Sequence, residues 1–357
     1  MINLLDEYYK QNIYCDNYIE RKIVLKERNY AIYGVTHSGK TYIVKNYLLN
    51  HKKGSYLYID CSDIRLHVDE LNKNIEQFCS ENNISILVYD NYNNSIVIPS
   101  VAQTVIIDEH LHVIDGFTPL HVRGLDFEEF LAYEYKYDST AINHLFKTGS
   151  LPFAHNLSLD TLHVTLQNIL KFKLDSIEIA ILSYLSQSSN NKISAFGFYE
   201  KIKSSQKISK DRLYLTLKNL INKEYIFQIE KLDAPRATKK LYLFDGGVKN
   251  ALTVNKNFLR LFETYVFLEM KKSGFEIFYD EKIDFYIPKD SRVVLSRPFF
   301  SNDSLFKTIE TIEAFLLQHN VLHVEIVTLS SEGTLNHPFI QAEVIPFASW
   351  AVIEGEE

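Results

Sequence analysis

The sequence predicts an α/β protein that begins with a doubly wound parallel sheet and continues into further domains. Two observations indicate the sheet: short apolar runs alternate with helical patterns along the first part of the chain, and these runs end in glycine or an acidic residue. A third observation is the length of 357 residues, which exceeds what one hydrophobic core usually organises, so we expect two or three domains.

The strands of this sheet can be assigned in chain order. The run "NYAIYG" at 29–34 is rich in strand-forming residues, and a helical pattern follows it directly. Further apolar runs occur at 55–63, 84–92 and 102–114, with a second helical pattern at 66–83. Runs without polar alternation are typical of parallel strands that are buried on both faces. We therefore expect three layers, with helices on both sides of the sheet.

The turn between the first strand and the first helix fits the pattern G-x-x-x-x-G-K-[ST] of a phosphate-binding loop, or Walker A motif. Its glycines let the backbone curl so that amide groups face a phosphate, while the lysine adds a positive charge and the threonine a hydroxyl ligand for Mg²⁺. The following helix directs its positive end at the anion. We predict a nucleoside triphosphate bound by Gly34, Val35, Thr36, His37, Ser38, Gly39, Lys40 and Thr41.

Two aspartates at strand ends are candidates for the Walker B aspartate, the second residue expected to help bind Mg²⁺. "VIIDEH", with Asp108 and Glu109, fits the local Asp-Glu pattern better, whereas "ILVYDNY", with Asp90, fits the expected chain order better. We favour Asp90, which places Asn91 where a catalytic glutamate would stand. An amide can orient a water molecule but cannot accept its proton, so hydrolysis should be slow unless Glu109 substitutes. The alternative interpretation of Asp108 and Glu109 is a solvated strand end.

Later segments carry a family resemblance. In order, they are "GLDFEEFL" at 124–131, "LFKTGSLPFAHN" at 145–156 and "KKLYLFDGG" at 239–247. With the phosphate-binding loop before them, the chain resembles bacterial and archaeal AAA-type P-loop ATPases that carry a winged helix and a C-terminal domain similar to PD-(D/E)XK nucleases. The resemblance implies ATP as the nucleotide. It also implies a P-loop domain at 1–124, a helical lid at 125–174, a winged helix at 175–252 and a degenerate nuclease-like α/β domain at 253–357.

Three departures from the family pattern point to weakened catalysis. The loop carries Thr36-His37 where the family often has arginine, Asp90-Asn91 replaces Asp-Glu, and Gly116-Phe117 occupies the place of a Gly-Arg pair. The main hypothesis is an ATP-binding, slow or conditional ATPase that acts as a nucleotide-dependent switch. The alternatives are a binding module that does not hydrolyse ATP and a DNA-processing protein. AAA-type relatives often complete a site with a neighbour's arginine, so the resemblance also allows a homo-oligomer or a protein partner, but no such arginine is identifiable in this sequence.

DNA is a further candidate partner, which the segment 175–252 would bind. Its third helix has an apolar face of Leu213, Leu217, Leu220 and Ile221. Lysines and arginines outside this face would contact DNA phosphates, or would form an ordinary solvated face. The net charge of −7 argues against a large basic surface. The basic residues concerned are Lys207, Lys210, Arg212, Lys218, Lys223, Arg236, Lys239 and Lys240.

The C-terminal segment lacks a complete nuclease site. Such a site needs a helix glutamate, a strand aspartate and a Glu-x-Lys pair, so that carboxylates hold Mg²⁺ and lysine supports the attacking water. Glu263 and Asp284 match the first two places, but Leu295, Ser296 and Arg297 stand where Glu-x-Lys belongs. We therefore expect no nuclease activity, and structural roles for the two acids.

Composition favours a cytoplasmic protein. No apolar run approaches the ~18 residues needed to cross a bilayer, and Asp6, Glu7 and Lys10 interrupt the start where an export signal would be apolar. The cysteines at 15, 61 and 79 form neither a disulfide framework nor a metal-ligand pattern. We expect no membrane partner.

Overall fold

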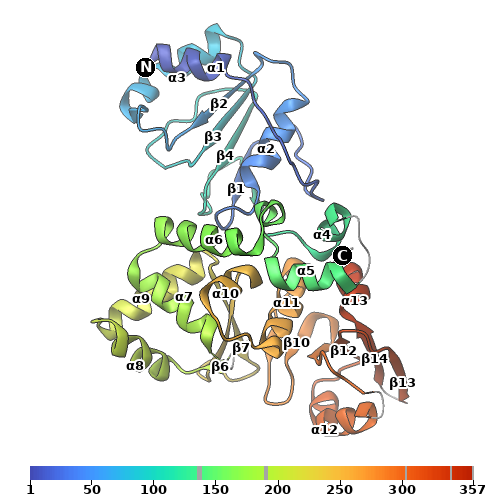
Figure 1. Cartoon of the computed structure of the whole chain (residues 1–357). Coiled ribbons are helices and arrows are strands. Elements are labelled where there is room, and N and C mark those ends of the chain that lie inside the picture. The colour runs from blue at the N-terminus through green and yellow to red at the C-terminus, as the bar shows by residue number, and fades with distance from the viewer. Residues whose placement is uncertain (135–138, 189–191, 302–303, 338–339, 356–357) are drawn as a thin grey trace. The chain divides into compact units, whose positions relative to one another are not determined.

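A computed structural model describes residues 1–134, 139–188, 192–301, 304–337 and 340–355 (Figure 1). They form two compact units, Met1–Gly124 (unit 1) and Leu125–Glu357 (unit 2). None of the helices in the described part of the chain combines the length and the apolar composition needed to cross a membrane.

Unit 1 contains a five-stranded sheet in the order β2-β3-β4-β1-β5, in which every pair of neighbours is parallel. The predicted α/β architecture with a parallel sheet is confirmed. The strand β1, which precedes the glycine-rich turn, lies between β4 and β5. The elements are α1 (Ile2–Lys10), β1 (Tyr30–Tyr33), α2 (Lys40–Leu49), β2 (Tyr56–Asp60), α3 (Val68–Glu81), β3 (Ile86–Asp90), β4 (Gln103–Ile107) and β5 (Thr118–His121).

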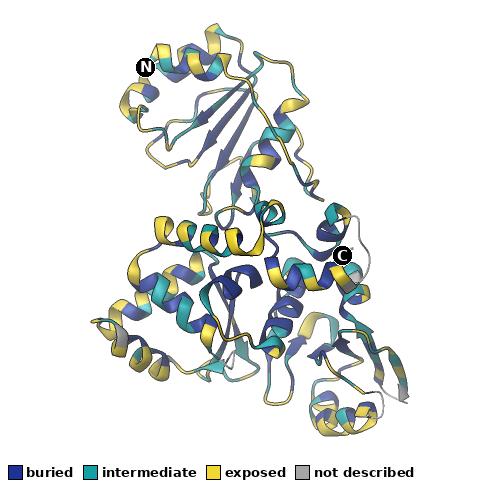
Figure 2. Ribbon diagram, viewed as in Figure 1, coloured by how far each residue is buried: buried dark blue, intermediate teal, exposed yellow. Residues whose placement is uncertain are grey.

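Helices cover both faces of this sheet. Successive side chains of a strand point to opposite faces, so β1 contributes to two cores. Tyr30 and Ile32 pack with Ile43 and Val44 of α2, whereas Ala31 packs with residues of α1 and α3. The strands β3 and β4 are buried along their whole length (Figure 2), which explains the apolar runs at 86–89 and 105–107 within them.

Unit 2 begins with helices, and its later part also contributes strands to a sheet whose central strands are short. Its helices are α4 (Phe127–Glu134), α5 (Ser139–Thr148), η1 (Pro152–Asn156), α6 (Leu159–Lys173), α7 (Ser176–Gln187), α8 (Ala195–Ser205), α9 (Lys210–Asn222), α10 (Gly246–Leu252), α11 (Phe258–Lys272), η2 (Pro288–Asp290), α12 (Leu305–Gln318) and α13 (Phe347–Gly355). Its strands are β6 (Lys192–Ile193), β7 (Ile226–Lys231), β8 (Lys239–Leu243), β9 (Phe278–Tyr279), β10 (Phe285–Ile287), β11 (Arg292–Ser296), β12 (His323–Thr328), β13 (Gly333–His337) and β14 (Ile340–Pro346).

These strands form one nine-stranded sheet in the order β13-β14-β12-β11-β10-β9-β7-β8-β6. The two halves are joined by a short parallel pairing of β7 with β9, through Glu230 with Phe278 and Lys231 with Tyr279. The helices α7, α8 and α9 precede the β7–β8 hairpin along the chain. The division of this unit at 174 and 252 into a lid, a winged helix and a nuclease-like domain stays a prediction.

A buried carboxylate links two of the segments that carry the family resemblance. Asp245, which is 1% exposed, accepts hydrogen bonds from the Ser150 amide at 2.6 Å and the Ser150 hydroxyl at 3.0 Å. It also caps α10 by accepting from the Val248 amide at 3.0 Å. At Gly149 a side chain is not tolerated, because φ is +89° and an added Cβ would lie 2.3 Å from Asp245 Oδ1. The short motifs around 150 and 245 are therefore two sides of one contact.

Candidate functional site

The glycine-rich turn of unit 1 has the backbone that its glycines predict. Gly34 has φ +143° and Gly39 has φ +98°, both in the region that favours glycine. A Cβ on Gly34 would lie 2.1 Å from the carbonyl oxygen of Val122, so the loop approaches the end of β5 too closely for any side chain. The helix α2 begins at Lys40, directly after the turn. Backbone amides at a helix start and in a curled turn are ready-made partners for an anion.

Lys40 is folded back over this loop. Its Nζ donates to the carbonyl oxygens of Gly34 and Val35, each at 2.8 Å, and the residue is only 8% exposed. These two carbonyl groups hold the ammonium group above the turn. Charged phosphate oxygens are stronger acceptors for an ammonium group than carbonyls are, so these two bonds can be exchanged for bonds to an anion.

The structure brings Thr41 and Asp90 together. Thr41 Oγ1 donates to Asp90 Oδ2 at 2.7 Å, across the sheet from the start of α2 to the end of β3. The competing Asp108 instead contacts His112, whose Nε2 lies 2.6 Å from Asp108 Oδ2. Both aspartates lie at the carboxyl edge of the sheet. Among the contacts described for the Thr41 hydroxyl, only the one with Asp90 reaches an aspartate. The assignment of Asp90 to the magnesium-side position stays a prediction, and Asp90 is the aspartate that Thr41 contacts.

A tyrosine from the neighbouring strand also holds Asp90. Tyr58 of β2 donates its hydroxyl to Asp90 Oδ2 at 2.5 Å. Burial, together with the negative charge of Asp90, raises the pKa of Tyr58 far above its usual range, so the phenol keeps its proton and remains a donor. The carboxylate is therefore oriented by two hydroxyl groups before any ligand arrives.

Asn91 points toward the outer edge of the sheet. Its Nδ2 donates to Asp60 Oδ1 at 2.9 Å, and Asp60 belongs to β2, the edge strand beyond β3. The residue has φ +56°, a conformation that asparagine tolerates better than most residues. Its amide is thus turned toward β2 and away from β1 and its loop. Glu109 follows β4, the direct neighbour of β1, and is half-buried there.

Two sets of polar contacts near the carboxyl ends of the strands of unit 1 are not indicated by the sequence. Arg21, which is 8% exposed, donates Nη1 to the carbonyl of Ser38 at 3.0 Å and Nη2 to the carbonyl of Arg123 at 3.1 Å. It fixes the glycine-rich turn to the segment after β5. Because Arg21 and Arg123 are far apart in sequence, no local pattern indicated this contact.

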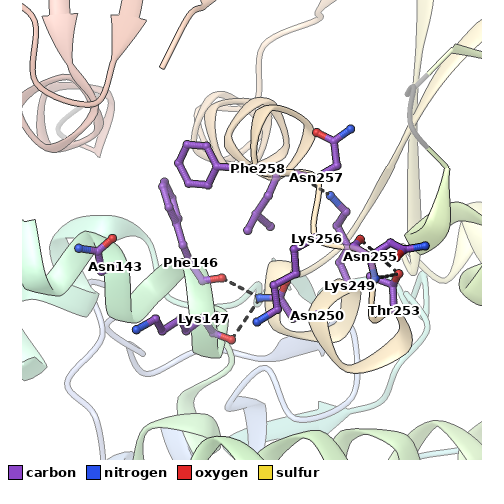
Figure 3. Close-up of a pocket in the computed structure, with 11 residues that line it drawn as sticks. Asn143, Phe146, Lys147, Lys249, Asn250, Thr253, Asn255, Lys256, Asn257 and Phe258 are labelled. Carbon is purple, nitrogen blue, oxygen red and sulfur yellow. Dashed lines mark hydrogen bonds between the residues drawn. The ribbon is translucent and has the colours of Figure 1, made fainter. Parts of the chain in front are cut away.

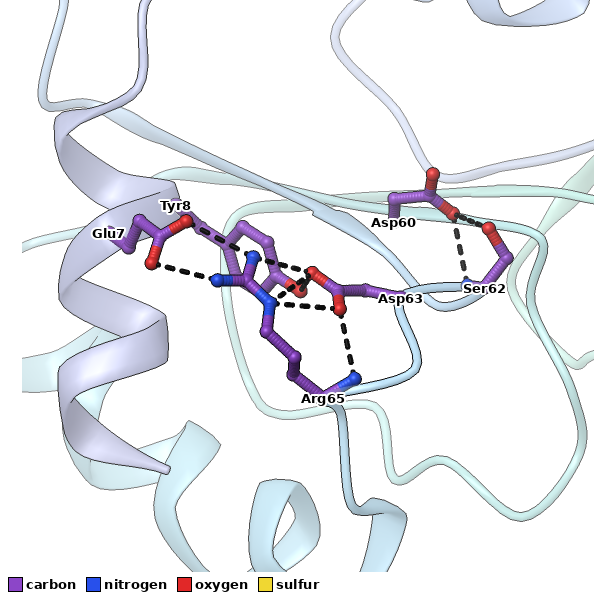
Figure 4. Close-up of polar contacts among 6 residues, drawn as sticks. All are labelled: Glu7, Tyr8, Asp60, Ser62, Asp63 and Arg65. Carbon is purple, nitrogen blue, oxygen red and sulfur yellow. Dashed lines mark hydrogen bonds and ion pairs between the residues drawn. The ribbon is translucent and has the colours of Figure 1, made fainter.

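The second feature lies beyond β2 and is shown in Figure 4. Arg65 donates to both oxygens of Glu7 at 3.1 Å and to Asp63, while Tyr8 donates its hydroxyl to Asp63 at 2.9 Å. Hydrogen bonds from Arg65 lower the pKa of Asp63 well below its usual range. This network ties α1 to the loop after β2, next to Asp60, the partner of Asn91.

In unit 2 the two predicted acids lie around one lysine. Lys240 Nζ is 2.9 Å from Glu263 Oε1 and 3.7 Å from Asp284 Oδ1. Tyr242 donates to Glu263 at 2.7 Å, and Arg297 pairs with Asp284. The cationic side chains Lys240 and Arg297 thus balance the charge of these carboxylates. Leu295 is fully buried in the core, so it offers no ligand.

Lys240 belongs neither to a DNA-contacting surface nor to a solvated face, the two alternatives considered from the sequence. Lys240 is 5% exposed, because alternation along β8 turns its side chain inward to Glu263. Lys239 pairs with Glu230, and Lys223 lies 3.6 Å from Glu178, so these two are engaged as well. The positions Lys207, Lys210, Arg212 and Lys218 are exposed, as a solvated face would be.

Comparisons with known proteins give distant matches. No family model matches the chain. A protein of Methanocaldococcus jannaschii, described as uncharacterized, is 24% identical over 389 aligned positions, which cover 90% of this chain and 88% of the relative. Among solved structures, the Walker-type ATPase of Pyrococcus abyssi aligns with a TM-score of 0.43 and 14% identity, over 63% of this chain and 90% of that one.

Proposed function

We propose that unit 1 binds ATP together with Mg²⁺ and hydrolyses it slowly, so that the protein acts as a nucleotide-dependent switch. The observation that carries the proposal is the pairing of Thr41 with Asp90 directly beside the loop that holds Lys40. A loop with amide donors, an ammonium group and two oxygen ligands at the carboxyl edge of a parallel sheet is what a triphosphate requires. The eight residues Gly34, Val35, Thr36, His37, Ser38, Gly39, Lys40 and Thr41 form this proposed binding loop.

The residues present fit a magnesium ion. Hydroxyl and carboxylate oxygens are the ligands that Mg²⁺ prefers, and Thr41 and Asp90 place one of each 2.7 Å apart. When bound, the ion would neutralise part of the phosphate charge. Lys40 would bind the terminal phosphates, and the amides of the turn would bind the phosphate nearest to α2.

Slow turnover follows from the positions of Asn91 and Glu109. The amide of Asn91 cannot accept a proton, and its hydrogen bond to Asp60 holds it toward β2. Proton acceptance from an attacking water then depends on Glu109, which follows the strand next to β1. A positioned general base typically contributes ~10²–10⁴ in rate, so a site without one retains binding and loses most of its turnover.

Replacing Glu109 with glutamine should lower the single-turnover rate of phosphate release by about tenfold or more, with ATP affinity unchanged. Glutamine keeps the size of the side chain and removes only the proton acceptor. The exposed Glu20 provides a matched control, because Glu20→Gln makes the same change elsewhere in unit 1 and should leave the rate unaltered. Equal rates for Glu109→Gln and the wild type would show that Glu109 is not the base.

A second candidate function is a binding module that holds ATP without turnover. The contact between Asn91 and Asp60 favours it, because this contact withdraws the side chain at the position of the usual catalytic glutamate. The two functions are separated by phosphate release: a stoichiometric ATP complex that releases no phosphate would identify the binding module.

For unit 2 we propose no nuclease activity. Lys240 and Arg297 already balance Glu263 and Asp284, so a divalent cation would have to displace them without a third carboxylate. Magnesium-dependent DNA cleavage that disappears in Asp284→Ala would contradict this proposal. We further propose that the lid, winged-helix and nuclease-like segments serve as contact surfaces of the switch.

A further inference from the structure

A pocket of about 190 Å³ lies within unit 2, between α5, α10 and the start of α11 (Figure 3). Three lysines contribute to its wall: Lys147 from α5, Lys249 from α10 and Lys256 from the segment that leads to α11. No acidic residue is among the described residues that line it. Phe146 and Phe258 form an apolar side. The pocket is therefore positively charged within a chain whose net charge is −7.

Lys249 is the unusual member of this group. It is 3% exposed, and its Nζ donates only one described hydrogen bond, a long one of 3.4 Å to the carbonyl of Asn257. Lys147 and Lys256 are exposed and, like Lys249, form no ion pair within the described part of the chain. A buried ammonium group without a carboxylate partner is costly, because burial removes water that no opposite charge replaces.

The charged groups around Lys249 make this cost larger. Arg260 of α11 is a second buried cation, and Glu263 of the same helix is already bound to Lys240 and Tyr242. Burial, followed by the charge of Arg260, lowers the pKa of Lys249 to about 7, while Glu263 opposes this shift. Lys147 and Lys256 add positive charge at the mouth of the pocket. An anion in the pocket would place negative charge beside the three lysines that line it.

We propose that this pocket binds a dianionic phosphate group, either inorganic phosphate or the phosphate of a small phosphorylated molecule. Lys249 supplies the buried charge, Lys147 and Lys256 the outer charges, and Asn143 an amide donor. The volume exceeds that of one phosphate, and Phe146 and Phe258 line an apolar side of the pocket that can contact an apolar group attached to the phosphate. The site lies in unit 2 and does not depend on the proposed ATP site.

The test uses the full-length Lys40→Ala protein, so that the loop of unit 1 does not compete for the anion. Isothermal titration with inorganic phosphate should show one saturable site. The double variant Lys40→Ala/Lys249→Met keeps a long side chain at position 249 but removes its charge. It should bind phosphate about 10- to 100-fold more weakly, which is the effect of losing one charge-assisted hydrogen bond. Adding Lys171→Met, at an exposed lysine of α6, should change nothing. Phenyl phosphate that binds more tightly than phosphate would identify a phosphorylated molecule as the ligand.

Phosphate changes its own charge near neutral pH, so a second titration uses sulfate, which stays a dianion from about pH 6 to about pH 9. Any change in sulfate affinity over this range then comes from the protein, and Lys249 is the group expected to cause it. The ammonium form binds the anion, so sulfate affinity should be highest below the pKa of about 7 and fall by about tenfold per pH unit above it. The Lys249→Met variant should lack this dependence.

The outcomes decide the proposal either way. Equal affinity with and without Lys249→Met, or sulfate binding that does not change with pH, would overturn it. Should Lys249→Met fail to fold, the pH series in the Lys40→Ala protein and the exposed variant Lys256→Met still test the site, since both leave Lys249 in place.

Discussion

Replacing Lys40 with alanine should weaken ATP binding by about 10²–10⁴-fold. The ammonium group lies over the glycine-rich turn and donates two hydrogen bonds, to Gly34 and Val35. If phosphate oxygens replace these carbonyls, the variant loses two charge-assisted hydrogen bonds of ~1.5–3 kcal/mol each. Equilibrium binding of labelled ATP and GTP to both proteins measures the loss and gives the base preference.

The matched control is Lys52→Ala, at an exposed lysine after α2. It removes the same charge from unit 1 and should leave the affinity within about twofold, since exposed charges interact weakly through water. Equal affinities of the wild type and Lys40→Ala would exclude the proposed ATP site. A loss for both variants would point to a general electrostatic effect instead of a specific contact.

The parallel sheet of unit 1 could be predicted because its signals are local. Strands buried on both faces are rich in apolar residues, and β3 and β4 carry apolar runs at 86–89 and 105–107. Gly34 and Gly39 carry positive φ values that only a few residue types tolerate, so the sequence also indicates the turn. The choice between Asp90 and Asp108 is different. It depends on which strand end the hydroxyl of Thr41 reaches, and strand order decides that in space.

Other features could not be predicted because their partners are distant in sequence. Arg21 reads as an ordinary basic residue until the carbonyls of Ser38 and Arg123 are brought to it. From the sequence, Lys240 looks like part of a basic surface, yet its position in β8 points its side chain at Glu263 of α11. In the sequence Lys249 looks like any helical lysine, because it is buried by helices from other parts of the chain, α5, α6, α7 and α11, which pack around α10. The sequence alone therefore does not show which charged side chains of a helix or strand are buried by other parts of the chain.

The largest stability effect is expected for Asp245→Ala. Asp245 is 1% exposed, and its carboxylate is held by the amides of Ser150 and Val248 and by the Ser150 hydroxyl. Burial raises the pKa of Asp245, whereas these donors lower it, so the charge is tolerated only because of them. Alanine would leave two buried amide donors without an acceptor. At ~1–3 kcal/mol for each, the free energy of unfolding should fall by about 2–6 kcal/mol.

The fluorescence of Trp350 can be used to measure this loss of stability. This residue is the single tryptophan of the chain, lies in unit 2 and is 2% exposed, so its fluorescence follows the unfolding of that unit. Urea unfolding should shift to a lower midpoint with an unchanged slope, because the same surface is exposed. Asp160→Ala, at an exposed carboxylate in the first turn of α6, should cost less than about 1 kcal/mol. Similar midpoints for the two variants would mean that Asp245 does not join the segments around 150 and 245. Those segments would then owe their stability to the surrounding apolar packing.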